Sequence, residues 1–108
     1  MTESATVVHS HGGNEFEWHP LKAASNLRKH GITFEEAATV FEDEHALLLN
    51  DEVHSDEEDR FLLLGLSEGR RLLSVVHLER GIRLRIICAR PATHGERREY
   101  DRERGVGV

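Results

Sequence analysis

The sequence has one cysteine, Cys88, and no apolar run that approaches the roughly 20 residues of a membrane-spanning helix. A single thiol cannot form a disulfide within the chain, and its apolar neighbours indicate a buried thiol in a reducing compartment. The first 15 residues lack the basic start and the apolar core of a secretion signal. We therefore expect a cytoplasmic protein of one modest domain that does not enter a membrane.

Lysine is absent from the C-terminal half, where arginine alone carries the positive charge. The formal net charge of −6 is unevenly distributed. Residues 35–59 hold eleven acidic side chains and no Lys or Arg, whereas residues 60–104 hold eleven arginines and six acidic side chains. Arginine binds phosphate and carboxylate groups through paired hydrogen bonds. The second half therefore either binds an anionic partner or presents its arginines as an ordinary solvated surface.

Two helices are predicted near the N-terminus, after a flexible polar tail over residues 1–14. The first runs from about Pro20 to His30, with proline in its first turn and Gly31 at its C-terminal end. The second runs from about Phe34 to Glu42 and follows a T-x-x-E capping box that begins at Thr33. The tail also holds an H-x-H pair, which supplies too few ligands for a metal site.

Apolar runs in the second half predict an antiparallel meander of about four strands, over residues 46–50, 61–66, 72–78 and 82–89. Pro91 ends the last strand because proline cannot donate a hydrogen bond to the sheet. A second capping box begins at Thr93 and starts a polar helix from about His94 to Glu103. The predicted class is α+β, with one domain over residues 15–104 and a frayed end at residues 105–108.

The hairpin formed by the last two strands carries the candidate chemistry. Side chains alternate between the faces of a strand, so Arg83 and Arg85 should share one face and repel each other unless an anion lies between them. A three-residue loop, Glu79-Arg80-Gly81, places His77 opposite Arg83, whereas a two-residue turn sends His77 to the other face. We expect the three-residue loop. The opposite face of the strand should then hold Ile82, Leu84, Ile86 and Cys88.

Seven motifs follow this order of elements: F-E-W-H-P-L-K (16–22), N-L-R-K-H-G-I-T-F (26–34), A-x-x-V-F-E-D (37–43), E-D-R-F (58–61), V-V-H-L-E-R-G (75–81), R-I-I-C-A-R-x-A (85–92) and E-R-R-E-Y (96–100). In this combination the chain resembles the BrnT family of bacterial type II toxins. The family often has Asp at the position of His19, and the position of His77 is not fixed, since other aromatic residues can occur there.

The resemblance implies a fold like that of the RelE ribonucleases and an RNA-cleaving activity that blocks translation. The implied partners are RNA, including mRNA on the ribosome, and a cognate antitoxin called BrnA. That antitoxin binds DNA, so operator DNA is a partner through the antitoxin alone. We therefore expect a cytoplasmic endoribonuclease toxin that needs no cofactor and no metal ion.

RNA is cleaved without a metal when the 2′-hydroxyl attacks the adjacent phosphate. The reaction needs a base for that hydroxyl, cations on the phosphate oxygens and an acid for the leaving oxygen. We expect Arg83 and Arg85, with Arg60 at a strand end, to bind the phosphate. His77 would transfer protons, and Lys29 would stabilise the leaving group. The expected RNA-binding residues are Arg80, Arg90 and Tyr100, the last by stacking on a base.

Each of these residues also has a purely structural interpretation. His77 can be a partly exposed strand histidine, Lys29 a helix-terminating cation, and Tyr100 a packing residue of the last helix. The two central arginines can pair with the acidic loop over residues 51–59. Two other functions therefore stay open. One is a non-catalytic module that binds the antitoxin as a co-repressor, and the other is a metal-dependent hydrolase that uses the acidic loop.

Overall fold

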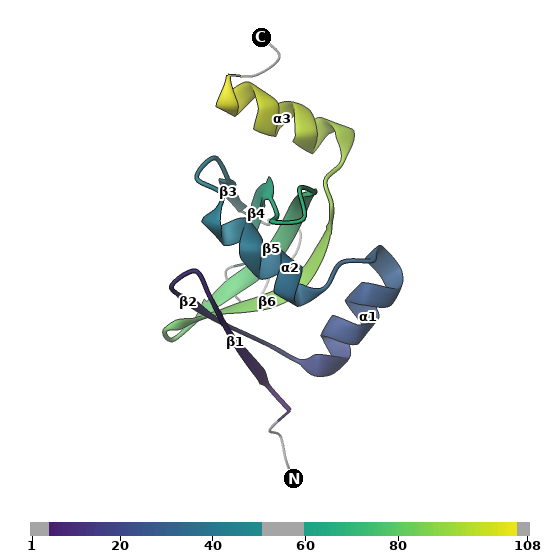
Figure 1. The fold of residues 1–108 in the computed structure, drawn as a ribbon, viewed down its shortest axis with the longest axis vertical. Helices are drawn as coiled ribbons and strands as arrows, with labels where there is room; N and C mark the ends of the chain where they lie inside the picture. Colours follow the sequence, from purple (N-terminus) through teal and green to yellow (C-terminus); the bar gives the residue numbers. More distant parts are fainter. Residues whose placement is uncertain (1–4, 51–59, 106–108) are drawn as a thin grey trace.

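The computed structural model describes residues 5–50 and 60–105. They form a six-stranded mixed sheet and three helices (Figure 1). In chain order the elements are β1 (Val7–His11), β2 (Asn14–Trp18), α1 (Pro20–His30), α2 (Phe34–Thr39), a 3₁₀ turn η1 (Val40–Glu42), β3 (Leu47–Asn50), β4 (Phe61–Leu66), β5 (Leu72–Arg80), β6 (Arg83–Pro91) and α3 (His94–Arg104). No helix among them is both long enough and apolar enough to span a membrane.

The strands lie in the order β1-β2-β6-β5-β4-β3, and neighbours are antiparallel except for the parallel pair β2 and β6. The α+β class is confirmed, and β3 to β6 form the expected meander. The prediction of about four strands is wrong, because a hairpin of β1 and β2 extends the sheet beyond β6.

The first part of the added hairpin, β1 and the turn up to Asn14, occupies residues that were predicted to be a tail. Val7 to His11 pair with Asn14 to Trp18 around a two-residue turn in which Gly12 and Gly13 have φ angles of 61° and 85°. Two consecutive positive φ angles are typical of the tight hairpin turn that favours glycine. Histidines at alternate positions of β1 replace the apolar residues that normally reveal a strand, so its period-2 pattern was hidden.

The main core lies between the sheet and the helices α1 and α2. Phe16, Phe34, Leu73, Val75 and Ile86 are almost completely buried there. A smaller cluster on the other face of the sheet joins Leu64 and Leu72 to Tyr100 of α3. The helices α1 and α2 therefore cover one face of the sheet, and α3 covers part of the other face.

Both N-terminal helices begin as their sequences predict, but α2 is shorter than expected. Thr33 accepts a hydrogen bond from the Glu36 amide, as in a capping box. The Glu36 carboxylate does not complete the box, because it binds Arg71 and the Ser67 hydroxyl. After Thr39 the chain tightens into η1, so the α-helix does not continue to Glu42.

The turn between β5 and β6 differs from the expected three-residue loop. Arg80 pairs with Arg83, which leaves a two-residue turn in which Gly81 alone has a positive φ, 63°. His77 therefore pairs with Ile86 and not with Arg83. The prediction that His77 lies opposite Arg83 is wrong, because the shorter turn changes the parity of the strand pairing.

A bulge in β6 changes the face of Cys88. His77 pairs with Ile86 and the next pair is Val76 with Cys88, so Ile87 is an extra residue in β6. Beyond the bulge the alternation is reversed, and Cys88 lies on the face of Arg85. The expectation that Cys88 shares a face with Leu84 and Ile86 is therefore wrong.

Asn26 closes the free edge of β6. The strand β2 pairs with β6 at Phe16–Leu84 and Glu17–Arg85, after which the chain leaves the sheet to form α1. Further along β6, the Asn26 side chain accepts a hydrogen bond from the Ala89 amide (3.0 Å) and donates to the Ala89 carbonyl (2.8 Å). It also donates to the carbonyl of Ile32 (3.0 Å). One buried side chain therefore takes the place of a neighbouring strand.

Replacing Asn26 by Ala should destabilise the protein by about 3 kcal/mol, because three buried backbone groups lose their partner. Urea unfolding measures the change. Ser25→Ala, on the same helix, is the matched control and should change the stability by less than about 0.5 kcal/mol. Equal stability of the two variants would show that the amide contributes nothing to the edge of β6.

Candidate functional site

Arg83 and Arg85 lie on the sheet face opposite α1 and α2, and the anions between them come from β2. Glu17 Oε2 accepts from Arg85 Nη1 at 2.7 Å, and Glu17 Oε1 lies 3.6 Å from Arg83 Nη1. Glu15 accepts from Arg83 Nε at 3.2 Å. Glu17 is only 6% exposed. Its carboxylate offsets the repulsion between the two guanidinium groups and fixes their direction.

Two more arginines lie on this face of the sheet. Arg80 lies across from Arg83 at the hairpin end. Arg60 precedes β4, and continuing the β4–β5 register by one residue places it beside Leu78, the partner of Arg85. Two strand spacings then separate Arg60 from Arg85 by about 10 Å. We call this surface the arginine face, with the members Arg60, Arg80, Arg83 and Arg85.

Arg60 has a buried donor without a partner. Its Nε is inaccessible to solvent and makes no hydrogen bond within the described part of the chain. Buried polar groups are nearly always paired, so this unpaired nitrogen is an exception among the described residues.

A pocket lies where α1 meets the free edge of β6. Its volume is about 280 Å³, and we call it the α1 pocket. One face of α1 supplies Lys22, Ser25, Asn26 and Lys29, which follow one another at helical spacing. The full lining is Lys22, Ser25, Asn26, Lys29, His30, Ile87 and Cys88. Two ammonium groups and an imidazole around a small polar hollow favour an anionic ligand.

The α1 pocket and the arginine face are neighbours along β6. Arg85 and Cys88 are three residues apart, which is about 10 Å along a strand. The bulge at Ile87 brings both side chains to one face. One extended polyanion can therefore contact the arginine face and the α1 pocket at the same time.

His77 lies in the core, away from the arginines. It is 4% exposed, and its ring packs against Phe41 and Phe61, with centroids 4.8 and 6.1 Å away. Burial lowers the pKa of its imidazole below the usual value, although a contact of Nδ1 with the Val75 carbonyl opposes this. The ring is therefore neutral at pH 7, and the structure does not bring it together with Arg83 or Arg85.

Arg90 and Tyr100 attach α3 to the sheet. Arg90 donates two hydrogen bonds to Glu96, at 2.9 and 3.0 Å, and this contact lowers the pKa of Glu96 to about 2. The Tyr100 hydroxyl donates to Asp43, and burial together with that carboxylate raises the pKa of Tyr100 to about 12. Tyr100 is 3% exposed, so its ring offers no open face on which a base could stack.

Several of these residues were not foreseen from the sequence. Glu15 and Glu17 have the same spacing as Arg83 and Arg85, and this matched pattern was the signal that could have paired them. His30 and Lys22 were not predicted to be site residues, because periodicity does not place a helix beside a particular strand edge. The acidic loop, residues 51–59, lies outside the described residues.

The buried state of His77 predicts a difference in how stability depends on pH. The unfolded imidazole has the ordinary pKa of about 6.5 and the folded one a lower pKa, so acid protonates the unfolded chain first. The contribution of His77 to the free energy of unfolding is fully present above pH 6.5. It is lost as the pH falls below that value, by at most about 1.4 kcal/mol per pH unit. His77→Phe, which keeps a ring among aromatic neighbours, should remove this part of the slope.

Thermal unfolding of both proteins between pH 7.5 and 5.5 measures the difference. The other histidines are present in both proteins and cancel in the comparison. Parallel slopes would mean that His77 is not buried as a neutral ring.

Comparison with known proteins supports a relationship over most of the chain. The family model described as "Ribonuclease toxin, BrnT, of type II toxin-antitoxin system" matches residues 18–96. The crystal structure of the Brucella abortus ribonuclease toxin BrnT is similar, with a TM-score of 0.55 and 22% identity over 71% of this chain and 94% of that chain. At that identity the structural likeness supports the fold alone. No curated protein matches. By its family match, the chain belongs to the BrnT ribonuclease toxins of type II toxin–antitoxin systems.

Proposed function

We propose that this protein is a toxin that cleaves RNA without a metal ion and thereby inhibits translation. Membership of the family supports a ribonuclease in general. The observation that carries the metal-free mechanism is that cationic side chains lie at two neighbouring places beside β6, the arginine face and the α1 pocket. Such an arrangement binds the phosphates of a single strand without help from a cation.

The arginine face holds the RNA backbone in this proposal. Arg83 and Arg85 donate to the non-bridging phosphate oxygens, and the guanidinium group of Arg60 adds positive charge beside them. These contacts stabilise the extra negative charge that develops on phosphorus in the transition state. Glu17 is a positioning residue, because it directs both guanidinium groups and does not touch the reacting atoms.

The α1 pocket supplies proton transfer. His30 is the general base and accepts the proton of the attacking 2′-hydroxyl. Lys29, the next residue, donates a proton to the leaving 5′ oxygen or neutralises its charge. The new bond joins the 2′ oxygen to phosphorus, and the bond to the 5′ oxygen breaks. His30 takes the role that the sequence suggested for His77, which is buried elsewhere.

Neutralisation by an antitoxin follows from the same surface. Glu15 and Glu17 already bind Arg83 and Arg85 through carboxylates. An acidic segment of a BrnA-like antitoxin can bind the remaining donors of the arginine face in the same way and exclude RNA. In this proposal operator DNA is contacted through the antitoxin, and the substrate includes mRNA on the ribosome.

The proposal is tested by measuring RNA cleavage by the purified protein in EDTA and growth arrest on induced expression. Wild type should cleave RNA and arrest growth. His30→Ala should lower the cleavage rate about 10²–10⁴-fold, as expected for loss of a general base. The double variant Arg83→Ala/Arg85→Ala should lower it by at least about 10²-fold.

The matched control is Arg97→Ala/Arg98→Ala, which removes the same charge from the exposed surface of α3. It should retain near-normal cleavage. Loss of activity in EDTA would contradict the metal-free mechanism. A wild-type protein that binds its antitoxin tightly but neither cuts RNA nor arrests growth would instead support the non-catalytic co-repressor.

A further inference from the structure

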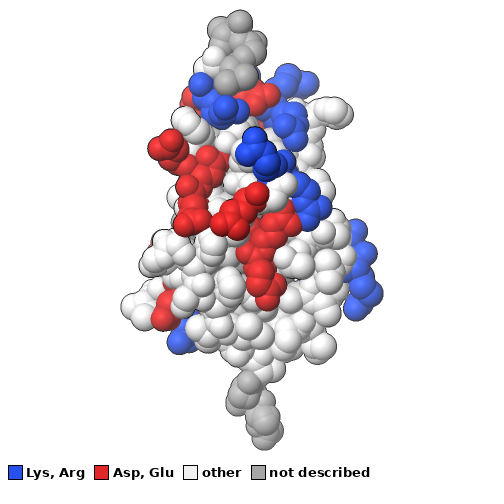
Figure 2. Space-filling view, viewed as in Figure 1, with Lys and Arg blue, Asp and Glu red and all other residues white. Residues whose placement is uncertain are grey.

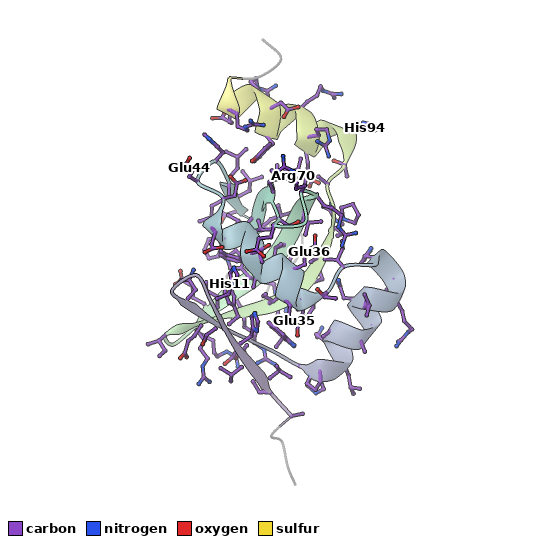
Figure 3. All side chains as sticks on the ribbon, viewed as in Figure 1. His11, Glu35, Glu36, Glu44, Arg70 and His94 are labelled. Carbon is purple, nitrogen blue, oxygen red and sulfur yellow. The ribbon has the colours of Figure 1, made fainter. Side chains whose placement is uncertain are left out.

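A second cluster of potential ligands lies on the opposite side of the molecule, away from the arginine face. Acidic side chains gather on the face formed by α2 and its neighbours (Figure 2). In Figure 3 the side chain of His11, at the end of β1, lies on the same face as Glu35, Glu36 and Glu44. The imidazole of His11 is within reach of two further carboxylates, those of Glu42 and Glu68. These two come from η1 and from the turn between β4 and β5.

The three groups converge on a small volume. His11 Nε2 lies 2.8 Å from a Glu42 oxygen and 3.7 Å from a Glu68 oxygen, and all three ligand atoms lie within 4.8 Å of one another. Neighbouring ligands of a tetrahedral zinc ion with bonds of about 2.0–2.2 Å lie roughly 3.3 Å apart. The separations of 2.8 and 3.7 Å lie on either side of that value, so small side-chain rotations would place the three ligands around one ion.

The charge of the cluster also favours a cation. The Nε2 atom of an imidazole carries at most one hydrogen, so it cannot donate a full hydrogen bond to each of two carboxylates. Within residues 5–50 and 60–105, neither Glu42 nor Glu68 forms an ion pair with a lysine or an arginine. Two like charges this close repel each other unless a positive charge lies between them.

The backbone leaves room for one of the carboxylates. A Cβ atom on Gly12, the first residue of the β1–β2 turn, would lie 2.4 Å from Glu42 Oε2. Because Gly12 has no side chain, the Glu42 carboxylate lies against the hairpin tip, beside His11. The turn therefore leaves space for a carboxylate next to the imidazole.

We propose that His11, Glu42 and Glu68 bind one divalent transition-metal ion, with zinc as the best match. An imidazole with two carboxylates suits zinc better than magnesium or calcium, which prefer oxygen ligands alone. Three protein ligands leave a fourth position for water. The ion fastens the tip of the β1–β2 hairpin to η1 and to the β4–β5 turn. This site is independent of the RNA-cleaving site and of the proposed function.

The experiment is zinc titration of the full chain by calorimetry and by thermal unfolding. Wild type should bind one equivalent of Zn²⁺, and its Tm should rise by roughly 5–10 °C at a free zinc concentration about tenfold above Kd. His11→Ala, Glu42→Gln and Glu68→Gln should each lose most of this shift. Glu68 is 68% exposed in its side chain, so this variant does not disturb packing.

Two control variants separate the site from general charge effects. Glu44→Gln removes the same charge from the same face, and His9→Ala removes the neighbouring histidine of β1. Both should keep the zinc-induced shift of the wild type. The proposal is overturned if zinc gives no shift, if the three ligand variants keep it, or if Mg²⁺ stabilises wild type and His11→Ala equally.

Discussion

The free edge of β6 is the constraint on which the rest of the structure depends. β2 accompanies β6 at two residue pairs and then leaves the sheet, so the backbone at Ala89 needs another partner. The Asn26 amide supplies it and thereby fixes α1 against this edge. Because Lys29 follows Asn26 by one helical turn, the same contact places a cationic helix end beside Ile87 and Cys88 of β6. Fold and candidate chemistry are linked through one buried side chain.

The local elements of the fold could be predicted from the sequence. Pro20 and Gly31 mark the ends of α1, and a complete capping box at Thr93 starts α3. The β1–β2 hairpin could not be recognised, since its strand places histidines where apolar residues usually lie. The length of the β5–β6 turn could not be predicted either, because Gly81 suits both a two-residue and a three-residue loop.

The candidate site could be predicted in part, and the limits have physical causes. Alternation along β6 places Arg83 and Arg85 on one face, and Glu17 binds both of them. The position of His77 could not be predicted, because nearly all of β5 is buried on both faces. Its side chains therefore do not alternate between exposed and buried positions. His30 reaches the site through tertiary packing, which no local pattern reveals.

The most direct test of the account is where RNA binds. ¹⁵N-labelled protein can be titrated with a short RNA whose attacking 2′-hydroxyls are replaced by hydrogen, so that it binds without being cut. We predict that the largest chemical-shift changes of backbone amides occur at Lys29, His30 and residues 83–88, and that they weaken steeply with salt. Largest shifts on α3, or on the acidic face around α2, would contradict this prediction.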